Sequence, residues 1–256
     1  RFSKRFAAKL PQPGKQELSR KPFLGGSIAV AGFILQHRNS DMIPTRNALI
    51  LGASGVTGAF LLKRLREAGM YKSIYAAVRR PRSVGHSSLQ EFPIDGTFPD
   101  REAMAGADVF CCLGTTMAKA GSKEAFRAVD YELPMRFARE AKAAGAKRFF
   151  LISAMGANPD SMVFYNRVKG ELERDLAALG FESLGIFRPG LLLGERAEKR
   201  PGEQFAKRIF GAINRFLPTF WKGIASDRVA ESMQRAAGAG WEGQRMFTNA
   251  AMIQGI

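Results

Sequence analysis

Residues 48–58 read ALILGASGVTG, a short apolar run that passes directly into three glycines, Gly52, Gly55 and Gly58. The apolar run is typical of a buried strand, and residues 56–68 have the spacing of an amphipathic helix that Gly69 closes. Such a sharp turn favours glycine, because side chains would keep a phosphate away from the free N–H groups of the helix. The segment therefore predicts a phosphate-binding turn, with a tight turn that binds no ligand as the alternative.

The pyrophosphate of a dinucleotide is the ligand that suits this turn. A strand precedes the glycines, a helix follows them, and two hydroxyl side chains can donate hydrogen bonds in addition to the backbone amides. In this context a GxxGxxG pattern indicates a dinucleotide more specifically than the three glycines do alone. We expect the phosphate-binding residues to be Gly52, Ser54, Gly55, Val56, Thr57 and Gly58.

Two arginines, Arg79 and Arg80, follow the second expected strand, residues 73–78. A carboxylate at this point would accept the ribose 2′-hydroxyl of NAD(H), whereas a cation binds the 2′-phosphate of NADP(H). Guanidinium groups suit bidentate contact with phosphate. The sequence therefore predicts NADP(H) in preference to NAD(H), with a pair of solvated surface arginines as the alternative.

The rest of the chain alternates strand-length apolar runs with helical windows. This alternation predicts an α/β fold, a Rossmann-type doubly wound parallel sheet with helices on both faces. Pro134 is expected to kink or break the longest helical window, and the 66 residues after Gly190 leave room for a small substrate-covering region. Strands are expected at 48–51, 73–78, 90–94, 108–113, 147–152 and 183–187, and helices at 56–68, 122–144 and 162–179.

A candidate catalytic set follows the fifth expected strand. Tyr165 and Lys169 are four residues apart, so they share one face of a helix. An ammonium beside a phenol favours the phenolate, which predicts a lowered pKa for Tyr165 and proton exchange with a substrate oxygen. Ser153 ends a strand at the edge where open α/β sheets bind ligands, and it is expected to hydrogen-bond the same oxygen. Taken singly, the YxxxK pair is a common pattern, and simple packing of the tyrosine is its alternative.

Composition limits the other classes of function. The formal net charge is +16, but basic residues are interleaved with acids and no nucleic-acid recognition pattern accompanies them, so we expect no nucleic acid as partner. With His37 and His86 as the two histidines, we expect no metal site. Cys111 and Cys112 are adjacent in an apolar run, which predicts packing rather than a disulfide and a reducing compartment, the cytoplasm.

Residues 1–41 differ in character from the rest. They hold 8 of the 39 Lys and Arg and 2 of the 23 Asp and Glu, with one apolar stretch at 23–35 that is too short for a transmembrane helix. We expect a basic extension, poorly ordered or upstream of the translated protein, and residues 42–256 as one NAD(P)-binding domain with a small C-terminal cap. An organelle-targeting leader is the alternative for the extension.

These motifs together resemble the short-chain dehydrogenase/reductase superfamily over about residues 47–187. More narrowly, the chain is similar to the atypical branch that contains the Tat-interacting-protein oxidoreductases. The matching motifs are GASG at 52–55, VRR at 78–80, CCLGTT at 111–116 followed by AG at 120–121, YNRVKGE at 165–171, RPG at 188–190 and RPGE at 200–203.

The resemblance implies roles for individual residues. Ser153 would donate to the substrate oxygen, Tyr165 would donate the proton, and Lys169 would hold the ribose and lower the pKa of the tyrosine. Leu113, Gly114 and Thr115 would line the nicotinamide-ribose side, with Tyr165 and Lys169 beside them, and Arg188 would border the pocket. The asparagine that many of these enzymes use to hold a relay water has no obvious counterpart, and Asp130 and Tyr131 stand in the corresponding stretch.

The function this predicts is an NADPH-dependent oxidoreductase that transfers hydride to a small carbonyl substrate. An NADP(H)-binding redox sensor without turnover is the alternative, with a partner surface drawn from the apolar residues between 205 and 221. A nucleotide-sugar epimerase shares the same motifs, but 66 residues after Gly190 are few to enclose a nucleotide sugar. A homodimer is possible, but no apolar helix face in the sequence establishes a dimer interface.

Overall fold

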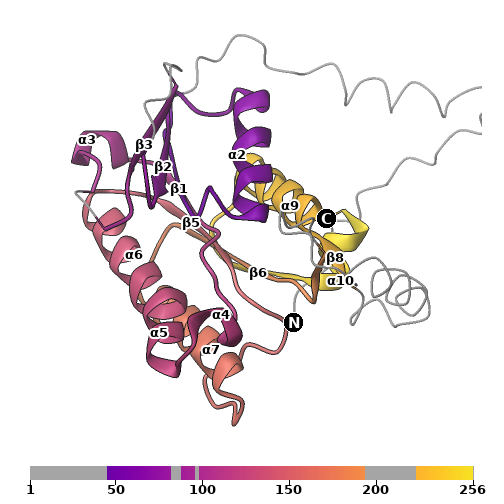
Figure 1. Ribbon diagram of the computed structural model, residues 1–256. Helices are drawn as coiled ribbons and strands as arrows, with labels where there is room; N and C mark the ends of the chain where they lie inside the picture. Colours follow the sequence, from indigo (N-terminus) through magenta and orange to yellow (C-terminus); the bar gives the residue numbers. More distant parts are fainter. Residues whose placement is uncertain (1–44, 82–87, 96–97, 194–222, 256) are drawn as a thin grey trace, which may run out of the picture. The chain divides into compact units, whose positions relative to one another are not determined.

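A parallel sheet forms the centre of the domain, and helices lie on both of its faces (Figure 1). The computed structural model describes residues 45–81, 88–95, 98–193 and 223–255, and within them the main sheet has seven strands in the order β3-β2-β1-β4-β5-β6-β9. They are β1 (Ala48–Leu51), β2 (Ile74–Val78), β3 (Leu89–Pro93), β4 (Asp108–Cys111), β5 (Arg148–Ile152), β6 (Ser183–Arg188) and β9 (Gly243–Thr248). The predicted Rossmann-type sheet is confirmed.

Two groups of helices sandwich this sheet. The helices α2 (Val56–Ala68) and α9 (Ser226–Gly238) lie side by side on one face, and α6 (Leu133–Ala143) and α7 (Phe164–Ala178) lie on the other (Figure 1). The shorter elements are α3 (Arg101–Met104), α4 (Met117–Ala120), α5 (Lys123–Arg127), the π-helical turn η1 (Ala128–Glu132), α10 (Asn249–Gln254) and a small pair of strands, β7 (Leu192–Leu193) and β8 (Ile224–Ala225).

The strands are apolar on both sides because both sides are covered. Ile50 and Phe110 belong to the core that contains residues of α2 and α9, whereas Leu49 and Val109 belong to the core that contains residues of α6 and α7. All four side chains are completely buried. Continuous apolar runs, rather than alternating ones, are what a parallel sheet between two helical layers requires.

The chain changes direction across the sheet at β1. From β1 it continues outward to β2 and β3, and it then returns to β4 on the other side of β1. Leu51 pairs with Ala77 of β2 and with Cys111 of β4, so the carboxyl ends of the three strands are level. Such a switch point leaves a crevice at the carboxyl edge of the sheet, where ligands of open α/β folds bind.

The helical window at 122–144 is interrupted earlier than expected. The segment consists of α5, η1 and α6 in succession, and Pro134 lies in the first turn of α6. The predicted break at Pro134 corresponds to the boundary between η1 and α6, which lies just before the proline. A proline lacks the N–H that would bond to the carbonyl of Asp130, and the chain takes a π-helical turn just before it, in which the Leu133 N–H donates to the carbonyl of Ala128.

The described part of the C-terminal region contributes to the sheet. Residues 223–255 form α9, the edge strand β9 and α10, which the sequence analysis did not assign. The expected extension at 1–41, the RPGE motif at 200–203 and the apolar residues between 205 and 221 lie outside the described residues.

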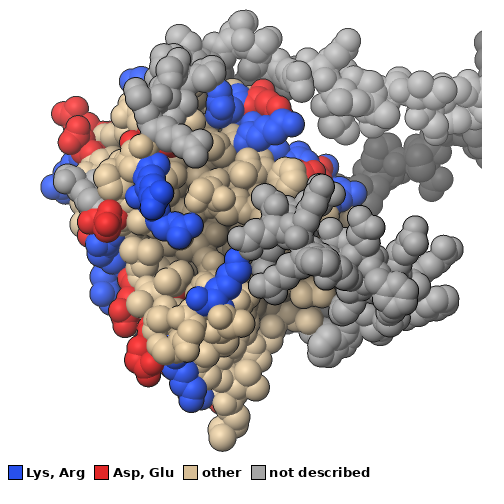
Figure 2. Space-filling model, in the orientation of Figure 1, with Lys and Arg blue, Asp and Glu red and all other residues tan. Residues whose placement is uncertain are grey.

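Charges of both signs share the surface. On the described part of the face shown in Figure 2, Lys and Arg side chains are interspersed with Asp and Glu rather than gathered in one continuous basic patch. Among the helices that the structure describes, none combines the length and the apolar character needed to cross a membrane.

Candidate functional site

The glycine turn between β1 and α2 is shaped by close backbone contacts. Gly52 has a φ of +79°, and a Cβ there would lie 2.8 Å from the carbonyl oxygen of Cys112, at the end of β4. A Cβ on Gly58 would lie 2.1 Å from the carbonyl oxygen of Gly52. The N–H of Gly55 donates to that same oxygen at 3.0 Å. Gly52 and Gly58 are therefore both needed for the turn to form.

The start of α2 is open toward the crevice. Gly55 is the N-cap residue, no side chain caps the helix, and no acid stands in its first turn. Ser54 and Gly55 are exposed, whereas Thr57 is buried. The free amides and the positive end of the helix dipole are consequently available to an anion.

A hollow of about 650 Å³ adjoins this turn. It joins the glycine turn to the end of β2, so the two predicted cofactor-binding segments border one space. Arg79 and Arg80 are both exposed at its rim. Glu91 of β3 also lines the hollow, which the sequence analysis missed because β3 gave a weak pattern. The lining residues are Ala53, Ser54, Leu62, Val78, Arg79, Arg80 and Glu91.

The loop after β4 is tied to α7, the helix that carries Tyr165 and Lys169, through an acid. The Thr115 N–H donates to Oδ2 of Asp130 at 2.8 Å, and Nζ of Lys169 lies 2.7 Å from Oδ1 of the same carboxylate. A Cβ on Gly114 would lie 3.6 Å from Asp130 Oδ1 and 3.8 Å from Lys169 Nζ. The structure thus brings together Lys169 and the predicted residues Gly114 and Thr115.

Ser153 follows β5 at the same edge of the sheet. Its backbone N–H donates to the carbonyl of Phe187 at 2.7 Å, which fixes its place beside β6. The side chain is 5% exposed, and among the described residues its Oγ has no hydrogen-bond partner. A buried hydroxyl without a partner is unfavourable unless a ligand or water completes it.

The pKa of Tyr165 lies above its ordinary value, contrary to the lowering that the sequence analysis predicted. Burial has the largest effect and raises it; Lys169 lowers it as expected, and Asp130 raises it again. The ring of Tyr165 packs 5.4 Å from that of Phe126, which contributes to this burial. At neutral pH the phenol is therefore protonated, the form that donates a proton.

Lys169 stays charged although it is 4% exposed. Burial acts to lower its pKa, but Asp130 and Tyr165 together outweigh burial, so the pKa of Lys169 lies above its ordinary value. The helix that carries both residues is held close to the preceding loop, since a Cβ on Gly170 would lie 2.2 Å from the backbone of Asn158.

Arg188 has a partner that the sequence analysis did not foresee. Its Nε donates to Oε1 of Glu173 at 3.0 Å, and its Nη2 donates to Oε2 of the same buried carboxylate. The pair joins the end of β6 to α7. Arg188 therefore borders the site mainly by fixing these two elements, and Asn249 supports the loop that follows by accepting from the N–H of Gly190 at 2.9 Å.

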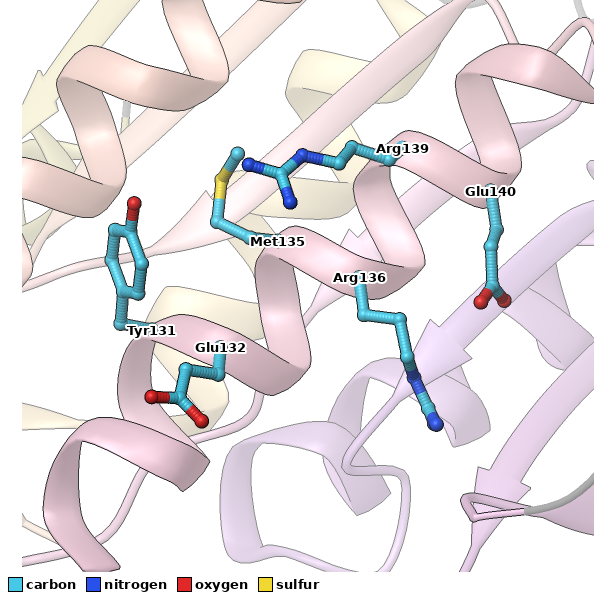
Figure 3. A pocket seen from close by; sticks show the side chains of 6 residues that line it. All are labelled: Tyr131, Glu132, Met135, Arg136, Arg139 and Glu140. Carbon is cyan, nitrogen blue, oxygen red and sulfur yellow. The ribbon is translucent and has the colours of Figure 1, made fainter. Parts of the chain in front are cut away.

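A second hollow lies on the outer side of η1 and α6 (Figure 3). Its lining side chains all come from this one helical segment, and they include none of the predicted site residues. Tyr131 instead donates to Asp175 of α7 at 2.6 Å. We therefore assign the candidate site to the carboxyl edge of the sheet. The residues lining the second hollow are Tyr131, Glu132, Met135, Arg136, Arg139 and Glu140.

Solved structures with the same architecture include proteins that hold NAD in their complexes. MoeE5 in complex with UDP-glucose and NAD is 18% identical, with a TM-score of 0.58 over 78% of this chain and 75% of that one. The UDP-N-acetylglucosamine 4-epimerase from Bacillus cereus is 14% identical, with a TM-score of 0.56 over 80% of this chain and 79% of that one. At such identities the likeness establishes the Rossmann-type fold.

Relatives of closer sequence define the family. Protein HTATIP2 of Rattus norvegicus is 38% identical over 194 residues, which cover 73% of this chain and 78% of that protein. Protein FMP52, mitochondrial, of Eremothecium gossypii is 42% identical over 159 residues, 61% of this chain and 70% of that protein. The HIM1 family model matches residues 98–221. The chain belongs to the family of HTATIP2 and FMP52.

Proposed function

We propose that this protein is an NADP(H)-dependent oxidoreductase that transfers hydride to a small carbonyl substrate. The observation that carries the proposal is the hollow that joins the open start of α2 to Arg79 and Arg80. Backbone amides there suit a pyrophosphate, and the two guanidinium groups suit the additional 2′-phosphate. Glu91 lines the same hollow, so the preference for NADP(H) depends on two cations outweighing one acid.

The residues at the carboxyl edge fit such a cofactor. A Cβ at Gly55 would lie 3.3 Å from the carbonyl oxygen of Gly52, a tight contact that glycine avoids at the open start of α2. The Oγ of Ser153, which has no hydrogen-bond partner among the described residues, could donate a hydrogen bond to an oxygen of a bound ligand. When bound, the nicotinamide would supply the hydride.

The chain's own groups would then handle the proton. Tyr165 is protonated at neutral pH and donates to the substrate oxygen as negative charge develops on it. Ser153 donates a hydrogen bond to the same oxygen, and the charged Lys169 holds the ribose hydroxyls and stabilises the developing charge.

The direct test measures NADPH oxidation over a panel of aldehydes, ketones and quinones. We expect consumption with at least one class, and a loss of at least about a hundredfold in kcat for Tyr165→Phe with NADPH affinity nearly unchanged. Tyr131→Phe is the matched control, because Tyr131 bonds to Asp175 away from the site and should keep full turnover. Unchanged turnover in Tyr165→Phe contradicts the mechanism.

The same measurements distinguish the two alternative functions, a redox sensor and a nucleotide-sugar epimerase. Saturable NADPH binding without consumption on the whole panel would favour the redox sensor. A purified protein that retains NAD together with a nucleotide sugar would favour an epimerase, the activity named for several structural neighbours.

The pH dependence of reduction follows from the raised pKa of Tyr165, whose first cause is burial. The protonated phenol is the active form, so the rate should stay level through neutral pH and fall only above the ordinary tyrosine pKa of about 10. A stopped-flow measurement of the hydride step from pH 6 to 11 checks this. A fall already near pH 7 would show a phenol with a lowered pKa instead.

For the location, the names of the fungal relatives describe mitochondrial proteins. This supports the organelle alternative for this chain rather than the cytoplasm that we expected from its cysteines. Fractionation of cells that express the full chain, with markers for both compartments, distinguishes the two.

A further inference from the structure

Asp130 is a buried acid that links two parts of the site. It is completely buried on the π-helical turn η1, and it is not among the described residues that line the hollow beside the glycine turn. One oxygen accepts from the Thr115 N–H of the loop after β4 at 2.8 Å, and the other lies 2.7 Å from the Lys169 ammonium on α7. A single carboxylate thereby fixes the loop and the helix relative to each other.

The segment around Asp130 is attached to α7 at three points. Besides the Asp130–Lys169 pair, Arg127 at the end of α5 pairs with Glu171 at 2.5 Å, and Tyr131 of η1 donates to Asp175 at 2.6 Å. The latter two contacts are partly exposed, whereas the Asp130–Lys169 pair is nearly completely enclosed. Exposed contacts of this kind contribute at most about 1 kcal/mol each. The enclosed pair acts differently, because a buried ammonium keeps its charge only beside an opposite charge, so Asp130 determines the charge state of Lys169.

We propose that Asp130 is a positioning residue that acts through Lys169. Its carboxylate keeps the Lys169 ammonium charged and aimed at the Gly114–Thr115 loop, and so determines where the nicotinamide ribose is held. The proposal deepens the function proposed above, because it rests on Lys169 as the group that holds the ribose. Asp130 itself touches no reacting atom.

The surroundings of the ammonium support this role. Three titratable groups act on it, namely Asp130 from η1, Tyr165 from its own helix and Cys111 from β4. Gly114 has no side chain to shield the pair, and a Cβ there would sit in ordinary contact with Lys169 Nζ. Because a lysine buried without a carboxylate loses its proton readily, the pKa of Lys169 should fall when the charge of Asp130 is removed.

The test compares Asp130→Asn, Lys169→Met and the double variant by calorimetric titration with NADPH. Asn keeps an oxygen for the Thr115 amide and removes the charge alone. We expect affinity to fall about tenfold in each single variant, the loss of one charged hydrogen bond, and to fall no further in the double variant, because both act through one contact. Additive losses would overturn the proposal. Asp175→Asn, which alters the neighbouring Tyr131 contact on the same interface, should leave affinity unchanged.

A second readout needs neither cofactor nor turnover. Nitrogen-15 NMR of the lysine ammonium groups in the full chain should show Lys169 protonated beyond pH 10.5 in the unaltered protein and titrating at least about two pH units lower in Asp130→Asn. An unchanged Lys169 titration in Asp130→Asn would overturn the proposal. If Asp130→Asn does not fold, the titration of Lys169 in the unaltered protein is the test. A Lys169 that loses its proton below pH 10 would show that Asp130 does not keep it charged, and would overturn the proposal. If NADPH does not bind at all, the proposed function fails while the NMR result still tests Asp130.

Discussion

Two buried carboxylates stand at opposite edges of the same sheet. Asp108 is the first residue of β4, at the amino edge, and Asp130 reaches the loop that follows β4, at the carboxyl edge. Both are completely buried, and each has a basic partner and a tyrosine nearby, Arg148 and Tyr71 in the first case and Lys169 and Tyr165 in the second.

The difference lies in the basic partner and in how complete each network is. Arg148 bonds to both oxygens of Asp108, and its remaining Nη1 donates to the carbonyl of Ala237 at the end of α9. Arginine does not lose its proton in proteins, whereas lysine does so when burial demands it. The Asp108–Arg148 pair at the amino edge therefore keeps its charges under all ordinary conditions. At the carboxyl edge, the charge of Lys169 responds to its surroundings, and the Oγ of Ser153 has no hydrogen-bond partner among the described residues.

The largest expected effect is on the stability of the amino-edge network. Asp108→Asn leaves Arg148 buried, charged and without a counter-ion, and the free energy of unfolding should fall by about 3–5 kcal/mol in urea titrations. Asp227→Asn, which breaks the partly exposed pair with Arg64, is the control and should change it by less than about 1 kcal/mol. Equal losses in the two variants would refute a special role for the buried pair.

A smaller loss is expected at the carboxyl edge. In Asp130→Asn the free energy of unfolding should fall by about 2–3 kcal/mol at neutral pH, because Lys169 escapes part of the penalty by releasing its proton. The pKa of Lys169 would then be lower in the folded than in the unfolded state, so the variant should regain stability as pH rises toward about 10.4. Unfolding titrations at pH 7 and 9.5 measure this slope, and Asp108→Asn should lack it.

Tyr71 gives the smallest effect. Its hydroxyl donates to Asp108 at 2.5 Å, and burial, followed by the charge of Asp108, raises its pKa well above the ordinary value. A raised folded pKa stabilises the protein below the unfolded pKa of about 10, and this stability is lost as pH rises further. Tyr71→Phe should lower the free energy of unfolding by about 1.5 kcal/mol at pH 7, and the deficit should shrink above pH 10. A deficit independent of pH would show that Tyr71 does not titrate with folding.

The two edges also differ in how far the sequence predicts them. The glycine turn, the strands up to β6 and the positions of Ser153, Tyr165 and Lys169 follow local patterns, because each depends on neighbours within a few residues. The partners of Lys169 and Arg188 do not. Asp130 is 39 positions from Lys169, and although its stretch stood out, no local pattern shows that its carboxylate contacts the lysine. The direction predicted for the pKa of Tyr165 was also wrong, because its burial depends on residues far away in the sequence, such as Phe126.

The strand β9 escaped prediction because its residues GQRMFT are mostly exposed, as befits an edge strand. Only its pairing with β6 defines it as part of the sheet. Glu91 was missed because β3 carries a polar pattern, although its neighbour Phe92 packs against the ring of Phe137. Long-range pairing, rather than local propensity, decides these elements.

The carboxyl edge of the sheet is expected to bind NADPH through the glycine turn and the two arginines. Isothermal titration calorimetry of the folded full chain tests this binding most directly. We expect saturable binding of one NADPH per chain, at least about tenfold tighter than NADH, and loss of that difference in the Arg79→Ala, Arg80→Ala double variant. Absence of binding heat with either dinucleotide, in a protein whose circular dichroism shows it folded, would contradict the account.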